Sequence, residues 1–498
     1  MNATTVLAYI TGKKTAYWSR VRETQALKTF HKAAQKVPAY KDFLKKHKID
    51  ASKIKTFKDF QNVPLINKEN YLREYPFESL CIDGTLAQPL VFTSTSGSTG
   101  KPFYFCRSNE IDWQSSVAHE LFYKNGFSKK ELQTDSTLVI VCFGMGVWIG
   151  GLITYQAFEM LEGRKYPISI ITPGINKDEI FKTLTNLAPR FKRLIFAGYP
   201  PFIKDIIDEA ADKKINLKKW DIRIIFAAEA FTERFRDYIG RKANIDDIYT
   251  DTMNIYGSAD IGTMAFETPT AILARRLILK RPALFNSVFG AINKTPTLAQ
   301  YNPLFITFEA PGGEIVLTAD NSLPLVRYSI GDHGGVFSYK ELEDQFGKEG
   351  MKLERQLKSH KLLSHNYELP FVYVYERMDM STTLYGLQIY PETIREVLLD
   401  NHINKFVTGK LTLASRYDKE QNQYLEINIE LKKDLEIPDS VQQLISNKIV
   451  GNLLHKNSEF KELYSYLKER AVPKLVFWPA EHPVYFKTGI KQKWVEKV

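Results

Sequence analysis

Apolar and polar positions along the chain fall into blocks that predict strands followed by helices. Residues 137–143 are apolar at nearly every position and predict a fully buried strand. The same order then repeats, with strands at 168–171, 194–197 and 222–227 and a helix near 176–188, 200–212 and 231–241 after each. Strands that alternate with helices predict a largely parallel sheet, with the ligand site at the carboxyl ends of the strands.

The two ends of the chain show other patterns. Residues 20–48 have apolar positions at helical spacing, and Asn67 is expected to cap a further helix. From about residue 380, strands near 406–414, 424–431 and 474–478 accompany a helix near 438–453. We therefore predict an α/β fold with a large N-terminal domain, residues 1–378, of mostly parallel sheets and flanking helices. A small α+β domain, residues 379–498, is expected to follow it.

The composition favours a soluble globular protein and argues against membrane-spanning and disulfide-rich classes. The chain has 498 residues, of which 44% are hydrophobic and 25% charged, as is typical of a soluble globular protein with several domains. No run approaches the roughly 18 apolar residues of a membrane span, and residues 1–20 lack a signal-peptide pattern, so we expect a cytoplasmic protein. The three cysteines indicate neither a disulfide framework nor a metal site, and Cys142 is expected to be a buried structural thiol.

The net charge of +11 is spread along the chain in short lysine runs. This distribution indicates solvated lysine faces and an affinity for anionic substrates, and it lacks the basic and aromatic pattern of a nucleic-acid platform. Residues 268–305 are both basic and apolar. They are interpreted as a helical insertion packed on the large domain, or as a surface for an acidic partner or a membrane. A second insertion is expected near 340–365, as a polar surface excursion.

Residues 93–102 form the most unusual stretch, with six hydroxyl residues and two glycines in ten positions and a lysine near the end. They connect two predicted strands, at 90–92 and 103–105. Glycines allow the backbone to approach a ligand closely, and hydroxyls, amides and a lysine suit phosphate oxygens. The spacing is not that of a Walker loop. The alternatives are therefore a phosphate-binding loop and a flexible Ser/Gly turn.

Three further motifs are candidates for a site. The stretches 144–151 and 227–229 follow predicted strands at their carboxyl ends. In 256–260, Tyr256 is suited to stack on a planar base and Asp260 to hold a divalent cation near phosphates. Asp332 is suited to accept hydrogen bonds from ribose hydroxyls. Each of these motifs taken alone is also explained by a turn or by tight packing.

Together these stretches resemble the adenylate-forming superfamily, and most closely its phenylacetate–CoA ligase and CapK-like branch. The resemblance extends over nearly the whole chain and rests on the order and spacing of many short motifs. These motifs are, in chain order, 37–40, 63–77, 95–102, 144–151, 227–229, 256–260, 327–332, 376–391 and the lysine-rich tail.

The resemblance implies a reaction and its cofactors. The carboxylate of an aryl or acyl acid would attack the α-phosphorus of ATP, giving an acyl-adenylate and pyrophosphate, and the acyl group would pass to CoA. ATP, Mg²⁺ and CoA are the implied cofactors, and the small domain is expected to rotate between the half-reactions. Deprotonated acid needs no general base for the first step, so the lack of an evident Ser-His-Asp or Cys-His pair is no objection.

The resemblance also implies roles for individual residues. The phosphates of ATP would be held by Ser96, Gly97, Ser98, Thr99, Gly100 and Lys101, with Thr99 also catalytic. The rest of the nucleotide would be held by Ala228, Glu229, Tyr256, Gly257, Ser258, Asp332 and the catalytic Arg377. The remaining assignments are Asp260 for Mg²⁺, Asp379 for the hinge, Gly386 for the acyl-acceptor tunnel, and Gly144, Gly146 and Trp148 for the acid pocket. Lys491 fits best as the late catalytic lysine, with Lys493 as the alternative.

Departures from the family pattern leave alternatives open. Ala259-Asp260 replaces the usual hydroxyl residue and glutamate, and Glu376 and Met380 stand at altered hinge positions. These changes indicate a divergent member. Acyl transfer to an amine or to an acidic carrier protein is one alternative to CoA. A nucleotide-binding interaction protein with degenerate chemistry is another, and an oligomer is compatible with the sequence.

Overall fold

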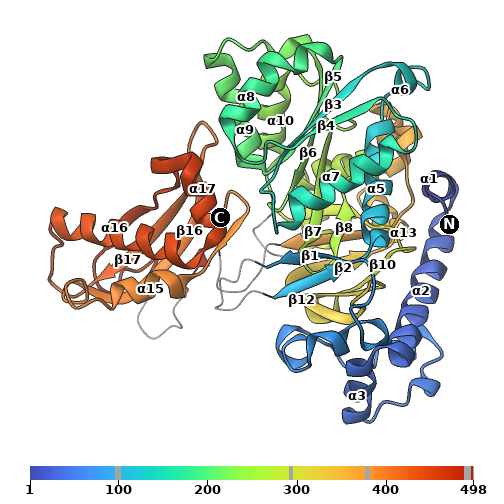
Figure 1. The fold of residues 1–498 in the computed structure, drawn as a ribbon, viewed down its shortest axis with the longest axis horizontal. Helices are drawn as coiled ribbons and strands as arrows, with labels where there is room; N and C mark the ends of the chain where they lie inside the picture. The colour runs from blue at the N-terminus through green and yellow to red at the C-terminus, as the bar shows by residue number, and fades with distance from the viewer. Residues whose placement is uncertain (96–102, 291–294, 376–381, 487–494, 497–498) are drawn as a thin grey trace.

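The computed structural model describes residues 1–95, 103–290, 295–375, 382–486 and 495–496 (Figure 1). Eleven of the described strands form one large sheet, in the order β10-β11-β12-β13-β9-β8-β7-β6-β5-β3-β4. Their bounds are β3 Thr137–Cys142, β4 Ile168–Ile171, β5 Arg193–Gly198, β6 Asp221–Ala227, β7 Thr252–Ser258, β8 Gly262–Phe266, β9 Thr297–Gln300, β10 Ile306–Glu309, β11 Glu314–Ala319, β12 Leu325–Phe337 and β13 Phe371–Tyr375.

The half of this sheet from β4 to β7 is parallel and has helices on both faces. Successive residues of β3 face opposite sides, so Leu138, Ile140 and Cys142 belong to one core and Val139 and Val141 to another. The first core is covered by α8 Lys177–Asn186, α9 Pro200–Asp212 and α10 Glu233–Ala243, and the second by α5 Asn109–Lys124 and α7 Ile149–Glu162. The predicted α/β fold is confirmed. The Cys142 thiol is buried, and burial raises its pKa, as expected for a structural cysteine.

From β7 to β10 the neighbouring strands of the sheet are antiparallel. This half packs against the N-terminal helices and the hairpin of β1 Val91–Ser94 and β2 Tyr104–Arg107. These helices are α2 Thr15–Lys36, α3 Pro38–Lys46 and α4 Phe57–Phe60. Helix α1 Ala3–Gly12 packs instead in the core that contains α5, and a short α6 spans Glu131–Thr134. No helix in the described ranges is both long and apolar enough to span a bilayer.

Two segments expected to be insertions are integral to this fold. Within 268–305, helices α11 Pro269–Leu279 and α12 Pro282–Phe289 lead into β9, an internal strand of the sheet. Within 340–365, α13 Tyr339–Lys348 and α14 Leu353–Ser359 bury apolar side chains in one core together with α11, α12 and β9. The polar surface excursion is therefore a pair of amphipathic helices, whose buried residues include Leu342, Phe346, Leu353 and Leu357.

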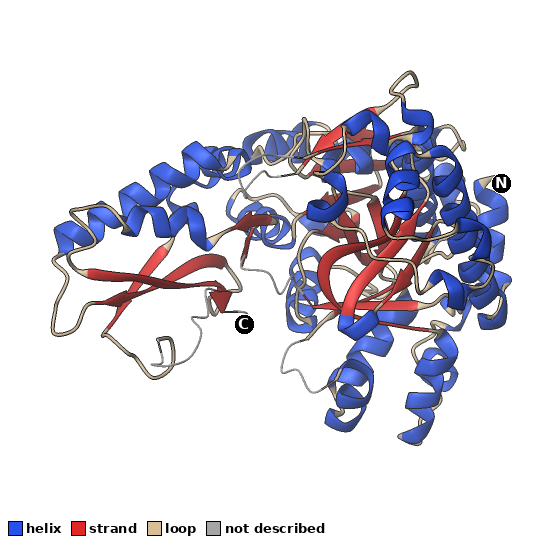
Figure 2. Ribbon diagram, turned by 90° about the horizontal axis from the view of Figure 1, so that it is seen from below, coloured by secondary structure: helices blue, strands red, loops and turns tan. Residues whose placement is uncertain are grey.

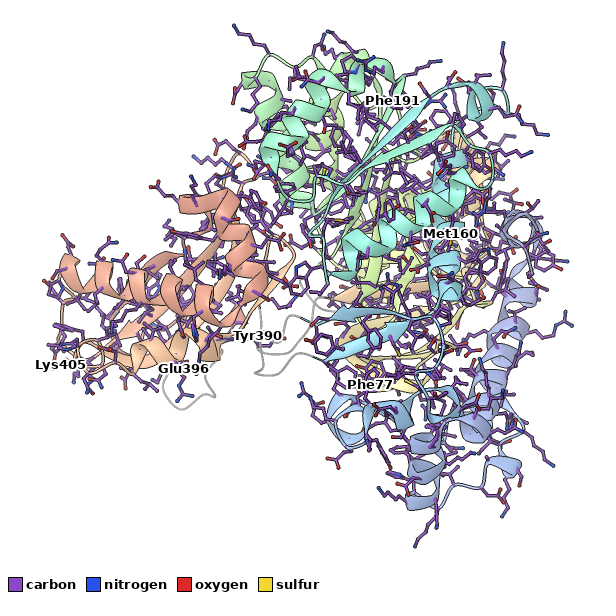
Figure 3. All side chains as sticks on the ribbon, in the orientation of Figure 1. Phe77, Met160, Phe191, Tyr390, Glu396 and Lys405 are labelled. Atoms are coloured by element: carbon purple, nitrogen blue, oxygen red, sulfur yellow. The ribbon has the colours of Figure 1, made fainter. Side chains whose placement is uncertain are left out.

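The C-terminal part is a separate layer of helices on a four-stranded sheet, with strand order β18-β17-β16-β19 (Figure 2). Its elements are β14 Thr382–Leu384, β15 Leu387–Ile389, α15 Pro391–Leu398, β16 Val407–Tyr417, β17 Gln423–Leu431, α16 Asp439–Lys456, α17 Ser458–Leu467, β18 Lys474–Trp478 and β19 Val495–Glu496. Tyr390 lies on the side toward the large part and Lys405 at the far end (Figure 3). Polar contacts join the two parts, among them Arg470 Nη2 to Asp205 Oδ1 at 2.7 Å.

Candidate active site

A cavity of about 330 Å³ lies beside the carboxyl ends of the parallel strands, where the small part meets the large one. This is where a doubly wound sheet places its ligand. Its walls come from stretches far apart in the chain: Lys68, Ser94 and Thr95, His119, 148–150, 227–230, 254–260, Asp332, Gly386 and Glu459. Most of the described residues predicted for the site therefore surround one space.

Tyr256 and Asp332 come from different strands of the sheet and are in direct contact. The Tyr256 hydroxyl on β7 donates a hydrogen bond to Asp332 Oδ2 on β12, at 2.5 Å. The Tyr256 ring is stacked on Phe308, with ring centroids 6.3 Å apart, so its orientation is fixed. The aromatic residue predicted to contact a base and the carboxylate predicted to contact ribose thus share one side of the cavity.

Asn254 is a cavity residue that the sequence reasoning missed. It precedes Tyr256 by two positions on β7, so both side chains lie on one face of the strand. Its Nδ2 donates to the carbonyl of Glu229 at 3.2 Å, which ties the strand to the loop after β6. Its Oδ1 is buried and has no hydrogen-bond partner among the described residues. Asn254 therefore keeps one acceptor in the cavity wall that no described residue pairs.

The Asp260 carboxylate is held from two sides. Lys68 Nζ lies 3.4 Å from its Oδ1, and the Tyr328 hydroxyl donates to its Oδ2 at 2.7 Å. Lys68 opens the short helix Lys68–Leu72, and the predicted cap is confirmed because Asn67 Oδ1 accepts hydrogen bonds from two amides of that helix. The ammonium group of Lys68, from the N-terminal part of the chain, therefore lies at the cavity. The sequence did not predict this contribution.

These contacts bear on the predicted role of Asp260 in binding Mg²⁺. Magnesium is usually held by one or two carboxylates together with waters and substrate phosphates. Both Asp260 oxygens are engaged, and the ammonium group of Lys68 occupies the side where a cation would bind. No cluster of three candidate metal ligands exists within the part of the chain that the structure describes. The residues do not fit a metal ion held by the protein, and the metal role of Asp260 stays a prediction.

Ala228 and Glu229 follow β6 and line the cavity. Ala228 has a positive φ of 74°, which turns the chain sharply at the end of the strand. The Glu229 carboxylate accepts hydrogen bonds from the backbone amide of Gly386 and, at 3.0 Å, from Gln423 Nε2. The Glu229 carboxylate thus joins the small part to the large part, and its predicted role in holding the nucleotide stays a prediction.

Gly386 stands where no larger residue fits. Its φ is +84°, and a Cβ atom there would lie 2.5 Å from Cδ1 of Tyr199. It lines the cavity between Glu229 on one side and the Tyr199 ring on the other. The residue predicted for the acyl-acceptor tunnel therefore lies at the junction of the two parts. Its role in a tunnel stays a prediction.

The turn after β3 contributes to the cavity through some of its residues. Trp148 lines the cavity, together with Phe143 before it and Ile149 after it, whereas Gly144 and Gly146 do not. The two glycines shape the turn instead: Gly146 has a φ of +82°, and a Cβ on Gly144 would lie 3.0 Å from the Trp148 ring. Trp148 Nε1 donates to Glu462 Oε2 on α17 at 3.2 Å.

Glu459 is a further cavity residue that sequence reasoning missed. It lies one turn before Glu462 on α17 and reaches the cavity from the small part. Burial, and then the negative charge of Glu462, raise the pKa of the Glu459 carboxyl to about 7. The contact between the two parts therefore contains a carboxyl group that titrates near neutral pH.

Several predicted site residues lie outside the described residues: Ser96, Gly97, Ser98, Thr99, Gly100, Lys101, Arg377, Asp379 and Lys491. The segments next to some of them can be placed. Ser94 and Thr95, at the end of β1, line the cavity. Val374, near the end of β13, lines it as well. The phosphate loop, the hinge and the late lysine stay predictions.

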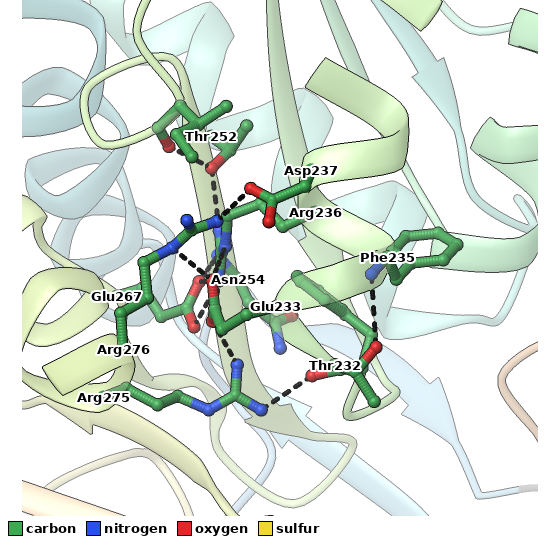
Figure 4. A network of polar contacts seen from close by, with 12 residues as sticks. Thr232, Glu233, Phe235, Arg236, Asp237, Thr252, Asn254, Glu267, Arg275 and Arg276 are labelled. Carbon is green, nitrogen blue, oxygen red and sulfur yellow. Dashed lines mark hydrogen bonds and ion pairs between the residues drawn. The ribbon is translucent and has the colours of Figure 1, made fainter. Parts of the chain in front are cut away.

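A buried network of charged side chains lies next to Asn254 (Figure 4). Arg236 is fully buried and forms ion pairs with Glu233 and Glu267. Glu267 Oε2 in turn accepts a hydrogen bond from the backbone amide of Asn254 at 2.9 Å. Arg275 and Arg276, from the basic segment 268–305, both form ion pairs with Glu233. Their charges are neutralised inside the protein, which does not favour an acidic partner at these two arginines.

Comparison with solved structures identifies the fold. The chain is similar to 2-hydroxyisobutyryl-CoA ligase in complex with 2-HIB-AMP and CoA in the thioesterification state, with a TM-score of 0.62 and 14% identity over 98% of this chain and 92% of that chain. It is also similar to that ligase in the postadenylation state in complex with R3-HIB-AMP, with a TM-score of 0.51 and 13% identity over 99% and 91% of the two chains. No protein-family model and no curated protein matches the sequence.

These likenesses show that the chain shares the fold of this CoA ligase over nearly its whole length. The coarse resemblance drawn from the sequence motifs is thus confirmed at the level of the fold. The phenylacetate–CoA ligase and CapK-like branch stays a prediction.

Proposed function

We propose that this protein activates a carboxylic acid with ATP, through an acyl-adenylate, and passes the acyl group to CoA. One observation carries the proposal. Motifs that are well separated along the chain, at 227–229, 254–260, Asp332 and Gly386, surround one cavity at the carboxyl edge of a parallel sheet. The order of these motifs in the chain and the fold of the neighbouring ligases support the same reaction.

The nucleotide half of the cavity offers a partner for each part of adenosine. The free Oδ1 of Asn254 is suited to accept a hydrogen bond from the adenine amino group. Tyr256 offers an aromatic face, and the Asp332 carboxylate, oriented by the Tyr256 hydroxyl, is suited to accept hydrogen bonds from the ribose hydroxyls. A buried acceptor without a partner costs about 1–3 kcal/mol, so a hydrogen bond from adenine to Asn254 Oδ1 favours nucleotide binding.

Adenylation needs positive charge rather than a base. A carboxylate oxygen of the acid forms a bond to the α-phosphorus, the bond from that phosphorus to the bridging oxygen breaks, and the electron pair leaves with pyrophosphate. Lys68 is the described cation on the cavity wall, and its ammonium group offsets negative charge on the phosphates. Because both oxygens of Asp260 already have partners in Lys68 and Tyr328, no step is assigned to a protein-bound Mg²⁺.

In the second half-reaction the CoA thiolate attacks the acyl carbonyl, and AMP leaves with the electron pair of the broken C–O bond. The nucleophile must enter beside the small part, where Gly386 and Glu459 line the cavity. An amine or a carrier-bound thiol would use the same adenylate. An amine attacks through nitrogen, whereas a carrier-bound thiol attacks through sulfur as CoA does. A protein that binds ATP without forming any adenylate is the remaining alternative.

The test is ATP–pyrophosphate exchange over a panel of aryl, short-chain and fatty acids, with Mg²⁺ present and folding checked by thermal melting. Exchange that depends on one class of acid supports adenylation. Measurable ATP binding without exchange for any acid would favour the interaction protein. Once an acid is found, CoA, amines or a carrier protein are added to pre-formed adenylate, and the one that consumes it identifies the acceptor.

A further inference from the structure

One polar group on the cavity wall is not used by the proposed mechanism. His119, on α5, is completely buried. Its Nδ1 lies 2.9 Å from the carbonyl oxygen of Ser115. A carbonyl oxygen only accepts hydrogen bonds, so Nδ1 carries the proton and Nε2 presents a lone pair. Burial lowers the pKa of His119 to about 4, so the ring is neutral at physiological pH.

The Nε2 atom of His119 has no hydrogen-bond partner among the described residues. The ring is fixed by the Ser115 contact on one side and by an edge-to-face contact with Phe158, with centroids 5.1 Å apart, on the other. Buried acceptors in native proteins are nearly always paired. His119 belongs to the cavity wall but is itself fully covered, so a molecule in the cavity supplies the missing donor once the side chains in front of Nε2 move aside.

The surroundings of His119 favour a neutral donor. Aliphatic and aromatic side chains, including Phe143, Ile153 and Tyr199, line the cavity around it. The neighbouring carboxylate on α5, Glu120, is paired with Arg164 and accepts a hydrogen bond from Tyr166. Three of the four carboxylates that line the cavity are held by other groups as well: Asp260 by Lys68 and Tyr328, Asp332 by Tyr256, and Glu229 by Gly386 and Gln423. An ammonium group beside His119 would therefore be buried at a high desolvation cost. A hydroxyl group carries the required proton at a much smaller cost.

We propose that the acid activated by this protein carries a hydroxyl group, and that this hydroxyl donates a hydrogen bond to Nε2 of His119. This inference rests on the proposed function and adds the chemical class of the substrate to it. His119 acts as a specificity-determining residue. A site built to pair a hydroxyl rejects an analogue that lacks it, because the buried acceptor is then left alone.

The test uses pairs of acids with the same carbon skeleton, one with a hydroxyl group and one with hydrogen or methyl in its place. Specificity is measured as kcat/KM in ATP–pyrophosphate exchange. For the wild-type protein we expect the best hydroxylated acid to exceed its partner by about 10²-fold or more. In His119→Leu the preference should fall to within about 3-fold, mainly through a lower value for the hydroxylated acid. His119→Gln keeps a side-chain acceptor and should restore part of the preference.

Control measurements separate the possible failures. His31→Leu removes an exposed histidine and should leave the preference unchanged. ATP affinity and melting temperature, measured on each variant, report whether the nucleotide half and the fold are intact. If His119→Leu does not fold, the wild-type acid pairs decide alone.

Each outcome has a definite meaning. A wild-type protein that uses both members of every pair equally well would overturn this inference and leave the proposed function standing, as would an unchanged preference in folded His119→Leu. Absence of exchange with every acid would overturn both.

Discussion

The ammonium group of Lys68 lies 3.4 Å from the Asp260 carboxylate, which the Tyr328 hydroxyl also contacts. This pair places a lysine from the short helix Lys68–Leu72 beside a carboxylate in the turn between β7 and β8. If the lysine offsets phosphate charge, Lys68→Ala should lower kcat for adenylation by about 10²–10³-fold, because one preorganised charge is lost. The measurement is the rate of pyrophosphate exchange at saturating ATP and acid.

Lys58→Ala is the matched control for this variant, since Lys58 is an exposed lysine on the neighbouring helix α4. It should retain full exchange. A Lys68→Ala protein with wild-type exchange would show that the lysine only pairs with Asp260 and has no part in the chemistry.

A second prediction concerns the hydrogen bond from Tyr256 to Asp332. Tyr256→Phe keeps the ring and removes the bond that orients the carboxylate. Hydrogen bonds to charged groups contribute about 1.5–3 kcal/mol, so ATP should bind roughly 10–100-fold more weakly. Calorimetric titration with ATP measures this. Tyr104→Phe, at a tyrosine with 53% of its surface exposed, serves as the control. Unchanged affinity in Tyr256→Phe would mean that this pair lies away from the nucleotide.

A third prediction concerns Gly386, which lies at the junction between the two parts. Gly386→Ala brings a Cβ atom within 2.5 Å of the Tyr199 ring at a φ of +84°, so the backbone must move and its hydrogen bond to Glu229 is lost. Acyl transfer to the acceptor should fall by at least about 10-fold while ATP binding persists, measured by single-turnover consumption of pre-formed adenylate.

Gly409→Ala is the control for that substitution. Gly409 has a φ of +81° on the same small part, but nothing lies within 4 Å of a Cβ added there. The control therefore imposes a similar backbone strain without the collision. Equal losses in both variants would attribute the effect to strain and not to the junction.

Glu459 predicts a pH dependence of the contact between the two parts. Burial and Glu462 raise the pKa of its carboxyl from 4.5 to about 7. When the small part is detached and this carboxyl is in water, the burial that causes most of the shift is removed and the pKa falls toward its ordinary value. Protonation therefore favours the docked arrangement: the contact is strongest below about pH 4.5, weakens as the pH rises toward 7, and is constant above that.

Fluorescence energy transfer between labels on the two parts measures this dependence between pH 5 and pH 8. Glu459→Gln should remove the pH dependence and keep the docked arrangement at all these values, whereas the exposed Glu469→Gln should behave as wild type. A pH dependence that survives in Glu459→Gln would assign the effect to another group.

Much of the fold is predictable because it follows from local periodicity. Strand β3 is apolar on both faces, and this pattern alone identifies it as an interior strand of a parallel sheet. Helices α13 and α14 were missed as elements because their few buried residues, such as Leu342 and Phe346, stand among many charged ones. Their apolar stripe is narrow, and it shows only when the sheet beneath it is known.

Some residues of the site were likewise predictable from the sequence, and others were not. Tyr256, Asp260 and Asp332 stand in ordered motifs, so their positions in the sequence predict a shared site. Lys68 and His119 carry no such signal, because their environment is created by partners far away in the chain: Asp260 for the lysine, and the cavity itself for the histidine. Residues of this kind are recognised from burial, charge and unpaired atoms and not from spacing.

Isotope transfer tests the central claim most directly. The acid is labelled with ¹⁸O in both carboxylate oxygens and incubated with the protein, ATP and an acceptor, and the nucleotide products are analysed by mass spectrometry. Attack of the carboxylate on the α-phosphorus, followed by acyl transfer, predicts AMP that carries one ¹⁸O atom. Unlabelled AMP, or ADP with phosphate in place of AMP with pyrophosphate, would contradict adenylation as the function of this protein.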